Sequence, residues 1–89
     1  MVQSDDLRQV MRQARALLLV GGPIDATSQN KLARKATAFI KDRNRAARLA
    51  EQLAVAISFH HMLAEMNREP VGPCREALSI LDEIEIVSG

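Results

Sequence analysis

Residues 41 to 45 read KDRNR, and this charged stretch decides how many helices the chain forms. It lies inside the segment 27–67, which is rich in good helix formers. Between Gly22 and Pro70 the chain has no glycine, and Pro23 is the only proline. Because the segment contains no helix breaker, it favours one long helix, bent or straight. Such a helix would span about 60 Å at a rise of about 1.5 Å per residue, so it would need a neighbour along its length.

The KDRNR stretch also supports a second interpretation, in which the chain turns. In a long helix Arg43 would fall on the face that should be buried, between two apolar stripes. Asp42 and Asn44 can both cap the N-terminus of a following helix. The segment is therefore predicted to form either one helix or two helices that separate near residues 42–44.

Two further helices flank this segment. A first helix is expected over about 5–20, where apolar residues recur at helical spacing after the candidate cap Ser4. The two glycines and the proline of residues 21–23 end it. A last helix is expected over about 73–86, with Pro73 in its first position. The predicted fold class is all-α, with three to four helices in a helical hairpin or bundle.

The composition indicates one small domain, residues 1–89, with little material for a core. Hydrophobic residues make up 47% of the chain, which excludes a disordered segment. Phe39 and Phe59 are the only aromatic residues, although aromatic side chains supply much of the buried area in small cores. Because the chain has only 89 residues, its core is expected to be completed by dimerisation.

The most apolar part of the long segment, residues 49–66, is the candidate interface. Its large apolar side chains cover nearly the whole helix circumference, and a helix that is apolar all round is buried on several sides. Its methionines would suit an adaptable contact surface. The predicted interface with a second copy or a protein partner consists of Leu49, Leu53, Ile57, Phe59, Met62, Leu63 and Met66.

The same stretch holds both histidines of the chain, His60 and His61. Adjacent helix positions point about 100° apart, so the two rings cannot bind one ion from a regular helix. His60 is in line with Ile57, which predicts a packed side chain facing inward. His61 is expected near the rim, one turn before Glu65. A pH-sensitive contact and a metal site are the alternatives.

The charges are unevenly distributed along the chain. Residues 1–50 hold ten Lys and Arg against four Asp and Glu, and residues 51–89 hold two against seven. On one continuous helix, the cations would form a stripe able to follow phosphates. Because no helix-turn-helix pattern, zinc ligands or aromatic platform accompanies them, a solvated or self-complementary face is the default interpretation. The candidate stripe consists of Lys31, Arg34, Lys35, Lys41, Arg45 and Arg48.

Several kinds of site find no support in the sequence. No acid, base and nucleophile stand in a defensible arrangement, so no catalytic residue is predicted. Cys74 is the only cysteine; it continues an apolar helical spacing and is expected to be a small buried side chain. Ligand spacings for a metal and motifs for a cofactor are not found. Without a signal-type or membrane-spanning run, the expected location is the cytoplasm.

These features predict a small non-enzymatic protein-interaction module. The expected protein is a dimeric regulator or adaptor, of the anti-activator or chaperone type, that binds and modulates a protein partner. The alternative is a small DNA- or RNA-binding transcriptional regulator that uses the basic stripe 31–48. In size and class the chain is similar to small helical accessory proteins of bacteria, but no motif supports a particular family.

Overall fold

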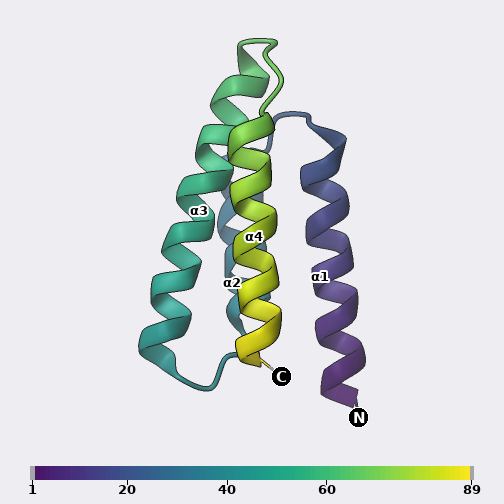
Figure 1. The fold of residues 1–89 in the computed structure, drawn as a ribbon, viewed down its shortest axis with the longest axis vertical. Coiled ribbons are helices and arrows are strands. Elements are labelled where there is room, and N and C mark those ends of the chain that lie inside the picture. Colours follow the sequence, from purple (N-terminus) through teal and green to yellow (C-terminus); the bar gives the residue numbers. More distant parts are fainter. Residues whose placement is uncertain (1, 89) are drawn as a thin grey trace.

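The computed structural model describes residues 2–88, with the side chains of residues 5–88, and these residues form four α-helices and no strand. The helices are α1 (Val2–Val20), α2 (Ala26–Thr37), α3 (Arg43–Glu65) and α4 (Val71–Ser88). Each runs antiparallel to the one before it, and both termini lie at the same end of the bundle (Figure 1). α1 and α3 form the two sides, and each packs against α2 and α4. The predicted all-α bundle is confirmed.

The KDRNR stretch contains a turn, so the prediction of one long helix is wrong. α2 ends at Thr37, residues 38–42 connect the helices, and Asp42 is the N-cap of α3. Its carboxylate accepts hydrogen bonds from the backbone N–H groups of Asn44 at 3.0 Å and Arg45 at 3.2 Å. This is the bonding expected of an aspartate at a helix start, where the first N–H groups have no partner within the helix.

The turn also has a cause in packing. Ile40, in the connection, is only 2% exposed and anchors it to the core. Arg43, which a continuous helix would have buried, is exposed at the start of α3. Folding α3 back along α2 lets the apolar faces of both helices cover each other, whereas a straight helix would leave both faces without a neighbour.

The N-terminal helix is longer than expected. α1 begins at Val2 rather than near residue 5, so the candidate cap Ser4 is inside the helix, and its side chain lies outside the described residues. The helix ends as predicted at Gly21, which has a φ of +81°. A glycine takes this left-handed conformation without steric cost, and its N–H reaches the carbonyl of Leu18 at 3.2 Å.

The last helix is two residues longer at each end than the expected 73–86, since it begins at Val71 and ends at Ser88. Its first turn is closed by the N–H of Cys74, which donates to the carbonyl of Pro70 at 2.9 Å. Pro73 is therefore the third residue of α4, where its missing N–H is still not needed by the helix. At the preceding helix end, Asn67 takes a φ of +57°. There the N–H of Arg68 bonds back to Leu63 O at 2.9 Å, which ends α3.

One chain closes its own core without aromatic residues. The radius of gyration is 12.4 Å, close to the value of about 12 Å expected for a compact chain of this length. Phe59 is exposed and Phe39 is only partly buried. Alanines in the core let the helices approach closely, so the core is filled without large aromatic side chains. The core consists of Leu7, Met11, Ala14, Leu18, Ile24, Leu32, Ala33, Ala36, Ile40, Ala46, Leu49, Leu53, Ala56, Ile57, Ala77, Leu81 and Ile84.

Candidate interaction surfaces

The residues predicted as an interface divide into two groups. Leu49, Leu53 and Ile57 are at most 2% exposed and lie in the core of the single chain. Their assignment to an interface between molecules is therefore corrected, because α2 and α4 already cover this face of α3. The sequence could not distinguish a face buried by the chain's own helices from one buried by a partner.

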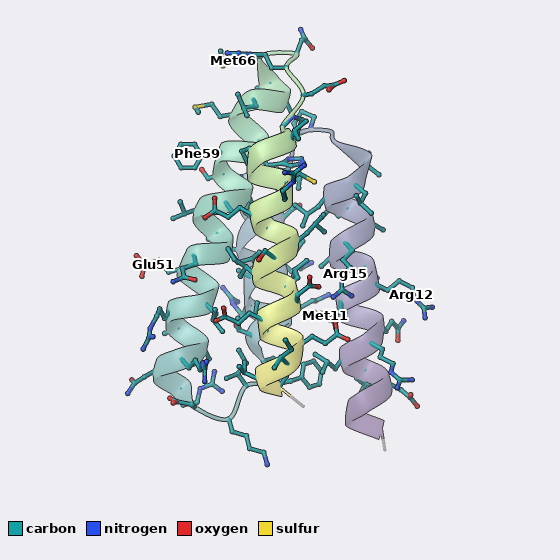
Figure 2. The ribbon with its side chains drawn as sticks, viewed as in Figure 1. Met11, Arg12, Arg15, Glu51, Phe59 and Met66 are labelled. Atoms are coloured by element: carbon teal, nitrogen blue, oxygen red, sulfur yellow. The ribbon has the colours of Figure 1, made fainter. Side chains whose placement is uncertain are left out.

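The second group, Phe59, Met62 and Met66, is exposed along the outer side of α3. Val55 was not among the predicted interface residues but lies on the same face of the helix, because the four residues recur at i, i+4, i+7 and i+11. Their exposed fractions are 50%, 52%, 48% and 55%. Figure 2 shows Phe59 on the side of α3 that points away from the other helices. We call these four residues the α3 stripe; Leu63, also predicted in the interface, is half-buried.

His60 and His61 have the separate environments that their spacing predicted. His60 is fully buried, and its Nε2 lies 3.2 Å from the carbonyl oxygen of Leu18 at the end of α1. His61 is partly exposed, and its Nε2 lies 3.0 Å from a carboxylate oxygen of Glu65 one turn later. The first ring thus adds a donor to the helix-end carbonyl of Leu18, which also accepts from the N–H of Gly21, and the second ring lies at the rim of the bundle.

Cys74 contacts the same carbonyl group as His60. Its thiol lies 3.6 Å from Leu18 O, and the side chain is partly rather than fully buried. The C-terminal end of α1 is therefore held by side chains of α3 and α4. Over the part of the chain that the structure describes, no group of three His, Cys, Asp or Glu side chains is placed to hold a metal ion.

The six candidate cations are all exposed, but they do not form one stripe. Because the chain turns at residues 38–42, three of them lie on α2, one in the connection and two on α3. Within residues 2–88 none of the six makes an ion pair. The positions are Lys31, Arg34 and Lys35 on α2, Lys41 in the connection, and Arg45 and Arg48 on α3.

One charge contact joins two helices of the chain, α1 and α4, at the opposite side of the bundle. The guanidinium group of Arg15 on α1 contacts Glu85 at 2.6 Å and Asp82 at 2.9 Å, both on α4. The hydrogen bond to Glu85, with a smaller contribution from Asp82, raises the pKa of Arg15 above its usual value. This ion pair uses an arginine outside the predicted stripe, so the self-complementary interpretation of the stripe itself stays a prediction.

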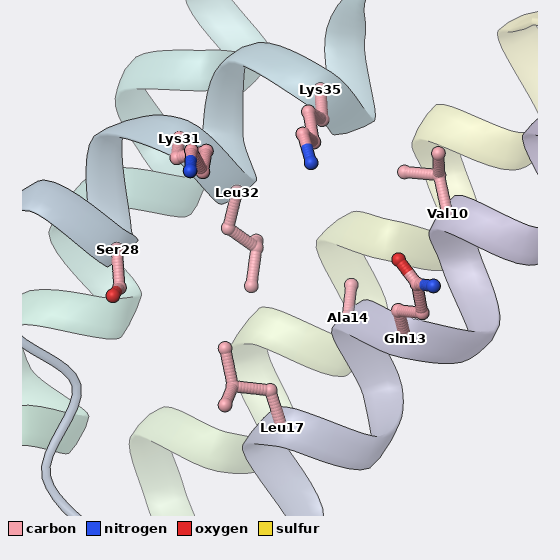
Figure 3. Close-up of a pocket in the computed structure, with 8 residues that line it drawn as sticks. All are labelled: Val10, Gln13, Ala14, Leu17, Ser28, Lys31, Leu32 and Lys35. Atoms are coloured by element: carbon pink, nitrogen blue, oxygen red, sulfur yellow. The ribbon is translucent and has the colours of Figure 1, made fainter.

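A groove between α1 and α2 is a feature that the sequence did not reveal (Figure 3). Its cavity volume is about 190 Å³. Leu17 of α1 and Leu32 of α2 point toward each other across it, and Lys31 and Lys35 lie along its α2 side. We call it the α1/α2 groove. It is lined by Val10, Gln13, Ala14 and Leu17 from α1, and by Ser28, Lys31, Leu32 and Lys35 from α2.

Comparison with known proteins found no matching family model, no matching curated protein and no matching solved structure. None of the helices formed by residues 2–88 is both long and apolar enough to cross a membrane. The function is therefore inferred from the chain's own surfaces.

Proposed function

We propose that the chain is a non-enzymatic helical protein-interaction module that acts as a dimeric regulator or adaptor for a protein partner. The observation that supports this function is the α3 stripe, a row of four large apolar side chains that are each about half exposed. Together they expose on the order of 400 Å² of apolar surface, and patches of this size on monomeric proteins are often functional. Covering them removes roughly 25 cal/mol per Å² of unfavourable contact with water, which would stabilise a complex.

A second copy of the chain is the proposed occupant of the α3 stripe, packed in the antiparallel direction. The same face of α3 continues toward its N-terminus through Glu51 and Arg48. Parallel packing would bring each of these charges next to the same charge of the other copy, whereas a two-fold axis through an antiparallel pair keeps like charges apart. Because a standard interface buries about 800 Å² on each partner, the stripe alone would give a weak dimer.

Sedimentation equilibrium of the isolated protein from micromolar to millimolar concentration tests the dimer. We expect reversible association in the wild type and a monomer for Phe59→Glu, which places a charge in the middle of the α3 stripe. Ala47→Glu is the matched control, because Ala47 is exposed on the same helix two turns before Val55 and lies about 80° around the helix axis from it. Circular dichroism checks that both variants remain helical. A wild type that stays monomeric throughout would contradict the dimer.

A second candidate function, nucleic-acid binding, is supported by the exposed cations of α2 and α3, which make no ion pair with any described side chain. Binding of labelled duplex DNA or single-stranded RNA would then weaken steeply as salt concentration rises, because counterions are released from the phosphates. Charge reversal at Lys35, Lys41 and Arg45 would abolish it. Fluorescence anisotropy with no salt-dependent binding would exclude this candidate, which is less favoured because the turn splits the cations between two helices.

A further inference from the structure

We infer that the α1/α2 groove binds one helix of a protein partner, an amphipathic helix that carries carboxylates along one edge. The inference rests on the proposed function as an interaction module, and it adds where the partner binds and what its chemistry is. The site is separate from the α3 stripe, since it is lined only by residues of α1 and α2.

The floor of the groove is apolar and only partly covered. Leu32 is almost buried at 9% exposure, whereas Leu17 opposite it is 41% exposed. Ala14, which lines the groove from α1 and is 3% exposed, has only a methyl side chain and so fills little of the space. A large apolar side chain of a partner could therefore enter between the two leucines and cover the remaining surface of Leu17.

The dimensions fit a helix better than an enclosed small molecule. On each wall the lining residues span two helical turns, 10–17 on α1 and 28–35 on α2, or about 10 Å. The volume of about 190 Å³ is below the ~300–1,000 Å³ of usual small-molecule sites. A shallow groove of this length suits two anchoring side chains spaced one turn apart, as in helix-in-groove recognition.

The charge of the groove selects an acidic partner. Lys31 and Lys35 are spaced i, i+4 along the α2 edge, and α2 contains no acidic residue. Neither lysine has an ion-pair partner in the part of the chain that the structure describes. The nearest acid on the lining face of α1 is Asp6, one turn before Val10. Two carboxylates at i, i+4 on a partner helix would match the spacing of the lysines.

The opposite edge of the groove is uncharged, so the charge contact is one-sided. Gln13 lies on the α1 edge, and Ser28 lies at the end of the groove near the start of α2. A bound helix is therefore expected to carry its carboxylates on the α2 side only and neutral polar residues on the α1 side. Exposed ion pairs contribute little affinity, so the lysines steer and orient the partner while the apolar floor provides the binding energy.

The chain's own acidic helix is a poorer occupant. In α4, Asp82 and Glu85 already pair with Arg15. In addition, α4 lies in front of the bundle and α2 behind it (Figure 1). If the α4 of one copy docked into the groove of a second copy, the α4 of the second copy would face away from the first. Such a head-to-tail contact builds an open chain of molecules rather than a closed dimer.

Two synthetic peptides test the inference on the full chain. One is an amphipathic helix with leucines at i, i+4 and i+7 and glutamates along one edge, and its twin has lysine at each glutamate position. In ¹⁵N–¹H NMR titrations we expect the glutamate peptide to shift the backbone amide signals of 10–17 and 28–35 saturably.

The double variant Lys31→Glu, Lys35→Glu should weaken binding of the glutamate peptide at least tenfold. The double variant Lys41→Glu, Arg45→Glu is the matched control, with the same change in net charge outside the groove, and should bind nearly as the wild type does.

Other results would overturn the inference. Absence of saturable shifts in the groove, or equal binding of both peptides, would show that the groove does not select an acidic helix. Shifts confined to the α3 stripe would also refute it. So would groove shifts induced by duplex DNA alone, or assembly of the isolated protein into open chains that the Lys31→Glu, Lys35→Glu variant abolishes. Failure of peptide binding leaves the sedimentation test of the α3 stripe unaffected, so the two proposals fail separately.

Discussion

His60 connects the C-terminal end of α1 to α3 inside the core. Its ring is fully buried and bonds to Leu18 O, whereas His61 makes a surface contact with Glu65. His60→Ala would remove the hydrogen bond and leave a cavity, so we expect the free energy of unfolding to fall by about 2–4 kcal/mol. His61→Ala should change it by less than about 1 kcal/mol. Urea unfolding of both variants checks this, and similar losses from the two would contradict the distinction between them.

Asp25, the N-cap of α2, makes part of the stability depend on pH. Its carboxylate accepts a hydrogen bond from the backbone N–H of Ser28 at 2.7 Å. This bond, followed by one from the Ser28 hydroxyl, lowers the pKa of Asp25 below its usual value. A lowered folded-state pKa means that the stabilisation is complete above the unfolded-state pKa and is lost as the pH falls through the folded-state pKa.

The expected result is a difference between two variants of this residue. Asp25→Ala should lower the urea midpoint at neutral pH, whereas Asp25→Asn, which also caps well, should preserve most of it. Below about pH 4 the wild type should lose its advantage over Asp25→Asn, because its carboxylate becomes protonated while the amide does not titrate. Urea unfolding from pH 3 to 7 measures this. A constant difference between wild type and Asp25→Asn across that range would contradict the role of the carboxylate charge.

At the level of elements, the start of α3 depends on Asp42. Its carboxylate bonds to two N–H groups of the first turn, which have no acceptor within the helix. Asp42→Ala should lower the free energy of unfolding by about 1 kcal/mol, and Asp42→Asn should stay close to wild type. Arg43→Ala is a control for the neighbouring exposed side chain and should have little effect. Thermal and urea unfolding check these values; an Asp42→Ala variant as stable as the wild type would show that packing alone fixes the turn.

Sequence predicted the helices more reliably than the turn between α2 and α3. The ends marked by Gly21 and by the Pro70–Pro73 region were located to within two residues, because these residues act on the local backbone. The turn near Asp42 has no such breaker. It depends on Ile40 entering the core and on α3 packing against α2, and both are tertiary effects. A local pattern therefore left two alternatives, and the absence of a breaker favoured the wrong one.

At the level of the whole molecule, the helical pattern identified which residues are apolar but not what covers them. Leu53 and Phe59 lie in the same helix and were assigned to the same interface, yet one is buried by α2 and α4 and the other is exposed. The α1/α2 groove escaped prediction for a related reason. Leu17 and Leu32 belong to separate helices, and only the arrangement of those helices places them opposite each other. Sites formed between elements need the packing of the elements as well as their periodicity.

The positions of the two surfaces predict that they act independently. The α3 stripe lies on the outer side of α3, and the groove lies between α1 and α2 with no lining residue from α3. Sites that share no residues usually contribute additively to free energies. We therefore expect Phe59→Glu to leave glutamate-peptide affinity per chain within about twofold of wild type, since additive sites agree to within roughly 0.3–0.5 kcal/mol. The Lys31→Glu, Lys35→Glu variant should likewise leave the dimer dissociation constant nearly unchanged.

Sedimentation equilibrium and peptide titration of each variant, and of the triple variant, measure the dimer dissociation constant and the peptide affinity. If peptide binding instead shifts the dimer equilibrium, dimerisation must change the peptide affinity by the same factor. The two surfaces would then be coupled through the bundle.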